Sequence, residues 1–469
     1  MGRCRDCRIV FLSFCARRDI ILKNKRAPLI RYFPSKHQKI LRLSVPAAIN
    51  SLLDMLQVII DLIMVGRLSA FAVAAVGLGL QSLMLVFGVL TMLHVGTGAL
   101  LSRFIGAKQI KRASLGLSTL LWFAVFLSVP ASGLWYVFSE KIYIWLGTDP
   151  LVTNLGISYV QLLTLMIPFL FVKSVFISAL NSAGDTKTPM KIKVISILLN
   201  IWLNYLLIFG NWGFPELGVR GAAVGTVMVN LLEVTVYVFL YMRRYTRFTP
   251  LLRYSVSLLR RALKVGIPAS FERLLTFGSF MLFTAIIARY GTEALAGYQI
   301  GLRVEGLAFM PGIGFTIAAM ALMGQGLGAK KPQQAKEDVL LVLKYTIGFM
   351  FFLSFFMIFV PEKIVRFFTD DTQTIEEASL YLRVVGFSQI PLAFNFVLSG
   401  ALRGAGDTKR TLKINLVSLW FIRILPAFVL TFYFESIVWV YLAMICDTFV
   451  KAIWLWVVFE KGKWQQLKV

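Results

Sequence analysis

The chain has 469 residues, of which 58% are hydrophobic and 15% are charged. Soluble globular proteins carry about 25% charged residues, so the composition excludes that class. The formal net charge of +26 would suit a nucleic-acid-binding protein, but the positions of the basic residues exclude that function. Long apolar segments match the roughly 20 residues that cross a bilayer. They predict an all-α, polytopic membrane protein.

The chain begins with a basic segment, residues 1–39, that has eleven Lys or Arg and two Asp residues. It lacks a clear small-residue cleavage site, so we do not expect a secretory signal peptide. Cys4 and Cys7 have the spacing of a zinc-ligand pair, but a structural zinc needs four ligands and no second pair follows. We expect a cytoplasmic arm against the lipid surface, with an overextended start as the alternative.

Apolar segments along the chain predict twelve transmembrane helices. They cover residues 41–65, 75–101, 115–138, 155–180, 194–210, 221–242, 265–288, 298–327, 339–360, 378–402, 414–432 and 437–459. The connections alternate, because those on one side carry 21 Lys and Arg residues and those on the other side carry six. The positive-inside rule places the basic side, and with it both termini, in the cytoplasm. The basic charge therefore reports membrane topology, and no nucleic-acid partner is expected.

A repeat relates the two halves of the chain. Residues 181–187 (NSAGDTK) and 403–409 (RGAGDTK) share AGDTK at an offset of 222 positions. The same offset relates Pro46 to Pro268, residues 106–108 to 328–330, and Asp149 to Asp371. Several matches at one offset indicate a duplicated unit of six spans.

The parity of the repeat predicts the architecture. Six spans return the chain to its starting side, so both halves have one orientation and are related by an axis along the membrane normal. We expect one six-helix lobe over residues 40–242, a second over 265–460, and a substrate path between them. Residues 243–264 join the lobes, and their arginines mixed with apolar residues predict an amphipathic helix on the inner leaflet. Residues 461–469 form a cytoplasmic tail.

The AGDTK stretch is not a nucleotide-binding loop. No G-x4-G-K-[ST] motif occurs in the chain, and neither copy follows the strand that such a loop requires. We expect Asp185 and Asp407 to cap or pin a cytoplasmic turn in which Gly184 and Gly406 permit the bend. Without a nucleotide site, uphill transport depends on an ion gradient. No cofactor is expected beyond H+ or Na+ as the coupling ion.

A coupled cation needs oxygen ligands or a titratable acid within the membrane. Inserting an acid there costs about 2.5–3.5 kcal/mol, so an intramembrane acid indicates function. The first span holds Asp54 and Asp61 with Gln57 between them, and this spacing places all three on one helical face. In the fifth span, Asn200 and Asn204 also share a face. For Asp61, near the outer end of its span, contact with headgroup water is the alternative.

The chain resembles the MATE (multidrug and toxic compound extrusion) family, and within it the bacterial NorM-like and DinF-like members. The resemblance covers roughly residues 40–460 and rests on residues 61–79, 181–190, 203–226, 301–335 and 402–411. It implies drug efflux by cation antiport, with a V-shaped cavity between two six-helix lobes. We accordingly expect a monomer in the bacterial inner membrane that contacts lipids and takes small organic, often cationic, substrates.

The resemblance also implies a cation site in the first lobe. It carries the family's first-span acid onto Asp61 and its fifth-span asparagine onto Asn200, where Na+ is possible. Many members have an aspartate at the position of Asn204. The asparagine in this chain leaves more of the task to Asp61, together with Asp54.

The second lobe matches the family less completely. Glu272 corresponds to the seventh-span acid of NorM-like members and is a further candidate for cation coupling, with neutralisation by the adjacent Arg273 near the inner interface as the alternative. Those members also have an aspartate in span ten, where this chain has only Asn395. By the internal offset, Asp61 corresponds to Phe283. The lobes are therefore expected to differ chemically.

Other polar residues also lie in the predicted spans. Asp447 and Lys451 are four residues apart and are expected to pair, and Lys173 is expected to extend toward the inner interface. Glu233 and Arg423 have no evident partner, and each suits a cavity lining or a packed bundle equally. The candidates for the substrate cavity are Asn50, Gln57, Glu233, Asn395 and Arg423.

The hypothesis of an H+- or Na+-coupled multidrug antiporter has two alternatives. A flippase of lipid-linked oligosaccharides shares the six-plus-six plan, but its cavity should hold several cations for a pyrophosphate, and few are available here. A membrane-embedded enzyme would need clustered metal ligands or a Ser/His arrangement. The two histidines, His37 and His94, lie in the basic arm and in the second span. We therefore expect a transporter and not an enzyme.

Overall fold

The computed structural model describes residues 36–467 apart from positions 146, 247, 252 and 435. In this part of the chain every regular element is a helix. Eleven helices are long and apolar enough to cross a membrane, and twelve spans result if one bent pair counts as a span. The prediction of an all-helical protein with about twelve spans is confirmed. Residues 1–35 of the expected basic arm lie outside the described residues.

The first half of the chain forms six spans. Its helices are α2 (Lys36–Gly66), α3 (Ala70–Ser82), α4 (Met84–Gly106), α5 (Ile110–Trp145), α6 (Pro150–Thr164), α7 (Ile167–Ser182), α8 (Lys187–Phe209), η1 (Asn211–Gly213) and α9 (Val219–Met242). Helices α3 and α4 together make the second span, and α6 and α7 make the fourth, which bends by 48°. Pro168, at the start of α7, cannot donate a hydrogen bond to the carbonyl of Thr164, so the helix breaks there.

The second half repeats this order of spans. Its helices are α10 (Val256–Ile287), η2 (Ala288–Tyr290), α11 (Thr292–Gly328), α12 (Pro332–Phe359), α13 (Pro361–Val365), α14 (Thr372–Gly404), α15 (Thr408–Val417), η3 (Ser418–Ile424), α16 (Leu425–Tyr433), α17 (Val438–Glu460) and η4 (Lys463–Gln466). Element η3 is a π-helical turn inside span eleven. It ends just before Pro426, which lacks the N–H that a regular α-helix would use at that position.

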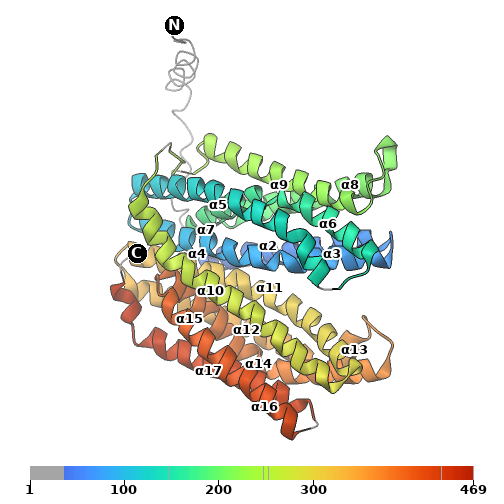
Figure 1. Cartoon of the computed structure of the whole chain (residues 1–469). Helices are drawn as coiled ribbons and strands as arrows, with labels where there is room; N and C mark the ends of the chain where they lie inside the picture. The colour runs from blue at the N-terminus through green and yellow to red at the C-terminus, as the bar shows by residue number, and fades with distance from the viewer. Residues whose placement is uncertain (1–35, 146, 247, 252, 435, 468–469) are drawn as a thin grey trace, which may run out of the picture.

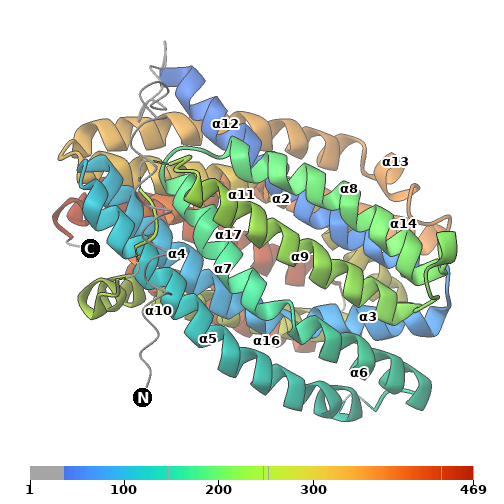
Figure 2. The same ribbon diagram turned by 90° about the horizontal axis from the view of Figure 1, so that it is seen from above.

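The two halves form two helical bundles that lie side by side. Figure 1 shows α2–α9 in one bundle and α10–α17 in the other, and the bundles diverge toward the end that carries α3 and α13. Seen from the perpendicular direction, the long helices of both bundles run roughly along one axis (Figure 2). The bundles meet where α10 packs on α4 and where α11 packs on α2 and α4.

Two glycines allow α4 and α11 to cross closely at the end of the molecule that carries the basic connections. A Cβ atom on Gly106 would lie 2.0 Å from the carbonyl oxygen of Gln325, and one on Gly328 would lie 2.1 Å from the carbonyl oxygen of Arg103. These two contacts are related by the offset of 222. The Arg103 guanidinium also donates to the carbonyl of Ala405 at 2.8 Å. The duplicated halves therefore contact each other through equivalent surfaces.

The AGDTK turns are similar in backbone but differ in their side-chain bonds. The glycines of both copies have φ of +84°, which confirms the expected bend. In the first copy, the Asp185 carboxylate accepts from the Thr188 backbone N–H at 3.1 Å and from its hydroxyl at 2.7 Å. In the second copy, Asp407 instead pairs with Arg410 at 2.7 Å. The difference arises because the residue three positions on is threonine in one copy and arginine in the other.

The repeat also provides two helix caps at the opposite end of the molecule. Asp149 accepts a hydrogen bond from the Leu151 N–H at 2.8 Å and starts α6, while Asp371 accepts from the Thr374 N–H at 2.8 Å and starts α14. The hydrogen bonds from Thr374 hold the pKa of Asp371 below its usual range. Satisfying the first N–H groups in this way fixes where each helix begins.

The segment that joins the bundles differs from the expected amphipathic helix. The described residues of 243–255 are not helical, and residues 256–264 belong to α10 itself. Backbone N–H groups of the linker donate to hydroxyls on α5, with Thr249 bound to Ser114 at 3.1 Å, Leu251 to Ser118, and Ser255 to Thr119 at 3.1 Å. These bonds satisfy a linker backbone that no helix satisfies.

Substituting Gly106 with alanine should destabilise the closed end of the molecule. The added methyl group overlaps a backbone carbonyl that cannot rotate away, so the free energy of unfolding should fall by about 1–3 kcal/mol. Thermal unfolding of the detergent-solubilised protein measures this change. Gly348→Ala is the matched control, because nothing lies within 4 Å of the added Cβ in that helix. Equal unfolding temperatures for the two variants would contradict the close crossing.

Candidate functional site

Helices α2 and α8 bring Asp61, Asn200 and Asn204 together, as the sequence predicts. The Asn204 side-chain N–H donates to Asp61 Oδ1 at 2.7 Å and, more weakly, to Asn200 Oδ1 at 3.5 Å. Both asparagines are fully buried. Because they are four residues apart on α8, they present their amides on one face toward α2.

A glycine on the neighbouring helix makes room for this amide. A Cβ atom on Gly225 of α9 would lie 2.4 Å from Asn204 Oδ1. Within the described part of the chain, Asn204 Oδ1 and Asn200 Nδ2 are buried without a hydrogen-bond partner. Buried amide groups usually have partners, so this corner of the bundle retains unused capacity to bind a polar group or an ion.

Asp61 has no counter-ion in the described residues, because no Lys, Arg or His nitrogen lies within ion-pair distance of its carboxylate. The Asn204 amide donates a hydrogen bond to it. A carboxylate inside a protein needs a cation or a proton to compensate its charge. The group formed by Asp61 and the two asparagines therefore has the chemistry to take up H+ or to offer oxygen ligands to Na+.

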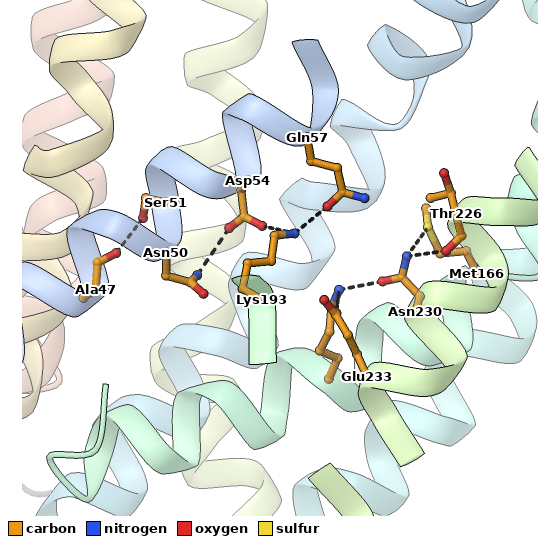
Figure 3. A network of polar contacts seen from close by, with 11 residues as sticks. Ala47, Asn50, Ser51, Asp54, Gln57, Met166, Lys193, Thr226, Asn230 and Glu233 are labelled. Atoms are coloured by element: carbon orange, nitrogen blue, oxygen red, sulfur yellow. Dashed lines mark hydrogen bonds and ion pairs between the residues drawn. The ribbon is translucent and has the colours of Figure 1, made fainter. Parts of the chain in front are cut away.

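Asp54 lies seven residues before Asp61 on α2 and, unlike Asp61, has a counter-ion. Lys193 of α8 places its Nζ 2.6 Å from Asp54 Oδ1 and donates to Gln57 Oε1 at 2.7 Å. The Asn50 amide reaches the second oxygen of Asp54 at 3.4 Å. Figure 3 shows these four side chains converging between α2 and α8.

Lys193 joins this polar group, although the sequence does not predict it as a site residue. Its position suggests a cytoplasmic connection, but it lies inside α8 with a side chain only 11% exposed. The available signal was its spacing, because Lys193 precedes Asn200 by seven residues, or about two helical turns. That spacing places it on the face of α8 that carries the asparagines.

Glu233 and Lys173 form a second ion pair in the same bundle. Lys173 Nζ lies 2.5 Å from Glu233 Oε2 and donates to Asn230 Oδ1 at 2.5 Å. Two expectations are therefore wrong: Glu233 has a partner, and Lys173 points into the bundle and not toward the inner interface. Figure 3 places Glu233 and Asn230 on α9, next to Lys193.

In the second bundle Glu272 is held by three neighbours. Its carboxylate accepts from the Arg403 guanidinium at 2.6 Å, from the Asn415 amide at 2.5 Å and from the Thr411 hydroxyl at 3.1 Å. The neutralising cation is thus Arg403. The expected Arg273 instead lies over the ring of Phe277 at 4.6 Å.

The remaining candidates of the second bundle belong to another ion-paired group. Asp447 pairs with Lys451 at 2.8 Å, as expected, and also with Arg423 at 2.8 Å. The sequence shows no evident partner for Arg423, and the structure identifies that partner as Asp447. Asn395 donates to the carbonyl of Thr448 at 3.4 Å, which ties α14 to α17.

The fold and these motifs agree with comparisons to known proteins. The model of the MatE family matches residues 46–206 and 268–429, and the two matches start 222 positions apart, at the offset of the internal repeat. The chain is 30% identical to the probable multidrug resistance protein NorM of Thermotoga maritima over 93% of this chain and 95% of that protein. It is 26% identical to the probable multidrug resistance protein YoeA of Bacillus subtilis over 83% and 86% of the two chains.

Solved structures share the fold at lower sequence identity. A multidrug resistance MATE family transporter of the MOP superfamily, in an outward-facing conformation, superposes with a TM-score of 0.86 at 20% identity and covers 92% of this chain and 97% of its own. A MOP superfamily transporter from Pyrococcus furiosus, described as having a binding pocket of reverse polarity, gives a TM-score of 0.87 at 20% identity over 95% and 100% of the two chains.

Removing Lys173 should destabilise the first bundle. In Lys173→Met the Glu233 carboxylate is left buried without its cation, which should lower the free energy of unfolding by about 3–5 kcal/mol. The double variant Lys173→Met/Glu233→Leu should recover most of this loss, because no charge then remains unpaired. Thermal unfolding measures both effects. The exposed pair Lys36–Glu337 supplies the control, and Lys36→Met should leave the unfolding temperature unchanged. A double variant as unstable as the single one would show that the pair is not the cause.

Proposed function

The chain belongs to the MATE family, whose members are multi-pass membrane transporters and not enzymes, and from this premise we propose that it exports small organic, often cationic, compounds in exchange for H+ or Na+. The observation that carries the proposal is Asp61, an intramembrane carboxylate that has an amide donor and no described counter-ion. Its charge can be compensated by a coupling cation, and releasing that cation leaves the charge uncompensated.

We place the coupling cation between Asp61, Asn200 and Asn204. When the cation binds, the Asp61 carboxylate no longer needs the hydrogen bond from Asn204, and the contact between α2 and α8 changes. Because α2 also packs on α11 of the other bundle, such a change reaches the surface on which the bundles contact each other. This connection supports a coupling between cation binding and the exchange of inward-open and outward-open states.

The polar contacts between the bundles support an outward-open state of the molecule. They gather at the end with the basic connections, where Gln325 donates to the carbonyl of Ser182 at 2.7 Å and Arg103 donates to the carbonyl of Ala405 at 2.8 Å. We assign that end to the cytoplasm by the positive-inside rule. Substrates would then leave through the diverging end seen in Figure 1.

The pairing of the interior cations argues against a flippase of lipid-linked oligosaccharides. Such a cavity needs cations that are free to hold a pyrophosphate. Five of the cations described within the spans are bound to carboxylates at 2.5–2.8 Å, namely Lys173, Lys193, Arg403, Arg423 and Lys451, whereas Arg273 lies over the ring of Phe277. A pyrophosphate would have to break these pairs, which favours the antiporter.

Asp61→Asn should abolish gradient-driven efflux. The amide cannot exchange a proton or neutralise Na+. We would measure ethidium transport in inverted membrane vesicles or in proteoliposomes, with pH and Na+ gradients imposed separately, and expect the rate to fall at least about tenfold. Asp370→Asn, on an exposed connection, is the control at matched expression and should transport normally. Undiminished efflux in Asp61→Asn would refute the site. Transport of a lipid-linked oligosaccharide, with no ethidium movement under either gradient, would favour the flippase.

A further inference from the structure

Asp54 is exposed on a face of α2 that does not point to lipid. Most exposed apolar residues of this helix share one face, namely Leu41, Val45, Ile49, Leu56, Ile59 and Ile63. The face of Asp54 also carries the exposed Val58, but Ala47 and Ser51, which precede Asp54 on it by seven and three residues, are buried inside the protein. Asp54 precedes Leu56 by two residues, which places it about 200° around the helix. Its side chain is nevertheless 57% exposed. The carboxylate therefore opens toward the interior of the transporter.

The two oxygens of Asp54 have different surroundings. Oδ1 contacts the Lys193 ammonium at 2.6 Å, whereas Oδ2 has only the 3.4 Å contact with the Asn50 amide. The Lys193 side chain is 11% exposed, so it lies behind the carboxylate as seen from the open side. One oxygen of an ionised acid is thus accessible to a second cation.

This arrangement separates the tasks of the two acids on α2. Asp61 has no described counter-ion and suits the exchange of H+ or Na+. The carboxylate of Asp54 already pairs with an ammonium from the same chain, Lys193, at 2.6 Å. A carboxylate that holds an ammonium in this way has the chemistry to recognise a positively charged group.

We propose that Asp54 recognises the positively charged nitrogen of an organic substrate, and that Lys193 is a tethered competitor that the substrate displaces from Asp54. The proposal rests on the export of organic cations proposed above, and it replaces the coupling role expected for Asp54 with substrate recognition. The competitor requires a substrate with a full positive charge, because a neutral molecule gains nothing by breaking the Asp54–Lys193 pair.

A second carboxylate near Lys193, that of Glu233, can receive the lysine when a substrate displaces it from Asp54. Glu233 lies on α9 beside Lys193 and already holds Lys173 at 2.5 Å. A displaced Lys193 therefore stays near a carboxylate, and its charge is not left uncompensated. Moving the lysine also changes the contact between α2 and α8, where the coupling-ion site lies.

Equilibrium binding of ethidium to the purified transporter in lipid nanodiscs, followed by fluorescence anisotropy without any gradient, tests the proposal. Lys193→Gln removes the competing charge and should lower the Kd for ethidium about tenfold, or about 1.4 kcal/mol. Lys193→Arg keeps the charge and should leave the Kd near that of the wild type. Asp54→Asn should weaken binding. The gain from Lys193→Gln should vanish when both substitutions are combined.

Three comparisons decide the outcome. Binding of the uncharged dye Nile red should be the same in all folded variants, which separates loss of a charge contact from a damaged cavity. Lys193→Met replaces Lys193→Gln if the latter does not fold. An unchanged Kd in the variant that removes the charge, Lys193→Gln or its replacement Lys193→Met, or an equal gain in the Asp54→Asn background, would overturn the proposal. The gain should persist in Asp61→Asn, so a failure of the proposed antiport and a failure of this inference give different results.

Discussion

A charge inside a membrane must be compensated, and this constraint organises the interior of the protein. Ion pairs at 2.5–2.8 Å join α7 to α9, α8 to α2, α14 to α10, and η3 to α17. Each of these four pairs links helices that come from different parts of the chain, so charge compensation also fixes which helices lie together. Among the described acids within the spans, Glu305 and Asp61 lack such a pair: Glu305 accepts from the Tyr381 hydroxyl at 2.5 Å, and Asp61 accepts from the Asn204 amide at 2.7 Å. Asp61 lies beside buried amide atoms of Asn200 and Asn204 that have no partner, which is why we place the coupling cation there.

The duplicated halves share their packing and differ in their chemistry. Gly106 and Gly328 make equivalent contacts in the two bundles. In each bundle a residue of the fifth span also contacts an acid of the first span. Lys193 contacts Asp54 in the first bundle, and Asn415, the equivalent of Lys193 at the offset of 222, contacts Glu272 in the second. The acids are not equivalent, however. A lysine that pairs with an exposed carboxylate can act as a competitor, whereas the amide of Asn415 helps to hold a carboxylate already bound by arginine.

The sequence was sufficient for features that depend on order along the chain. Hydropathy, the offset of 222 and the spacing of Asp54, Asp61, Asn200 and Asn204 predict the spans, the repeat and the polar faces. It was not sufficient for partners on different helices, such as Glu233 with Lys173. Periodicity shows which face of a helix is polar, but it does not show which helix meets that face. The same limit explains why the predicted linker helix is wrong. An amphipathic pattern over residues 256–264 does not reveal that these residues form the first turns of α10, which continues into the next span.

We propose that Asp61, and not Asp54, changes its charge state when the coupling cation binds. Infrared difference spectroscopy of the carboxyl bands, recorded on the purified protein as H+ or Na+ is added, observes this step directly. We expect a cation-induced carboxyl signal in the wild type and in Asp54→Asn, and its loss in Asp61→Asn. A signal that survives in Asp61→Asn and disappears in Asp54→Asn would show that Asp54 is the acid that binds the cation.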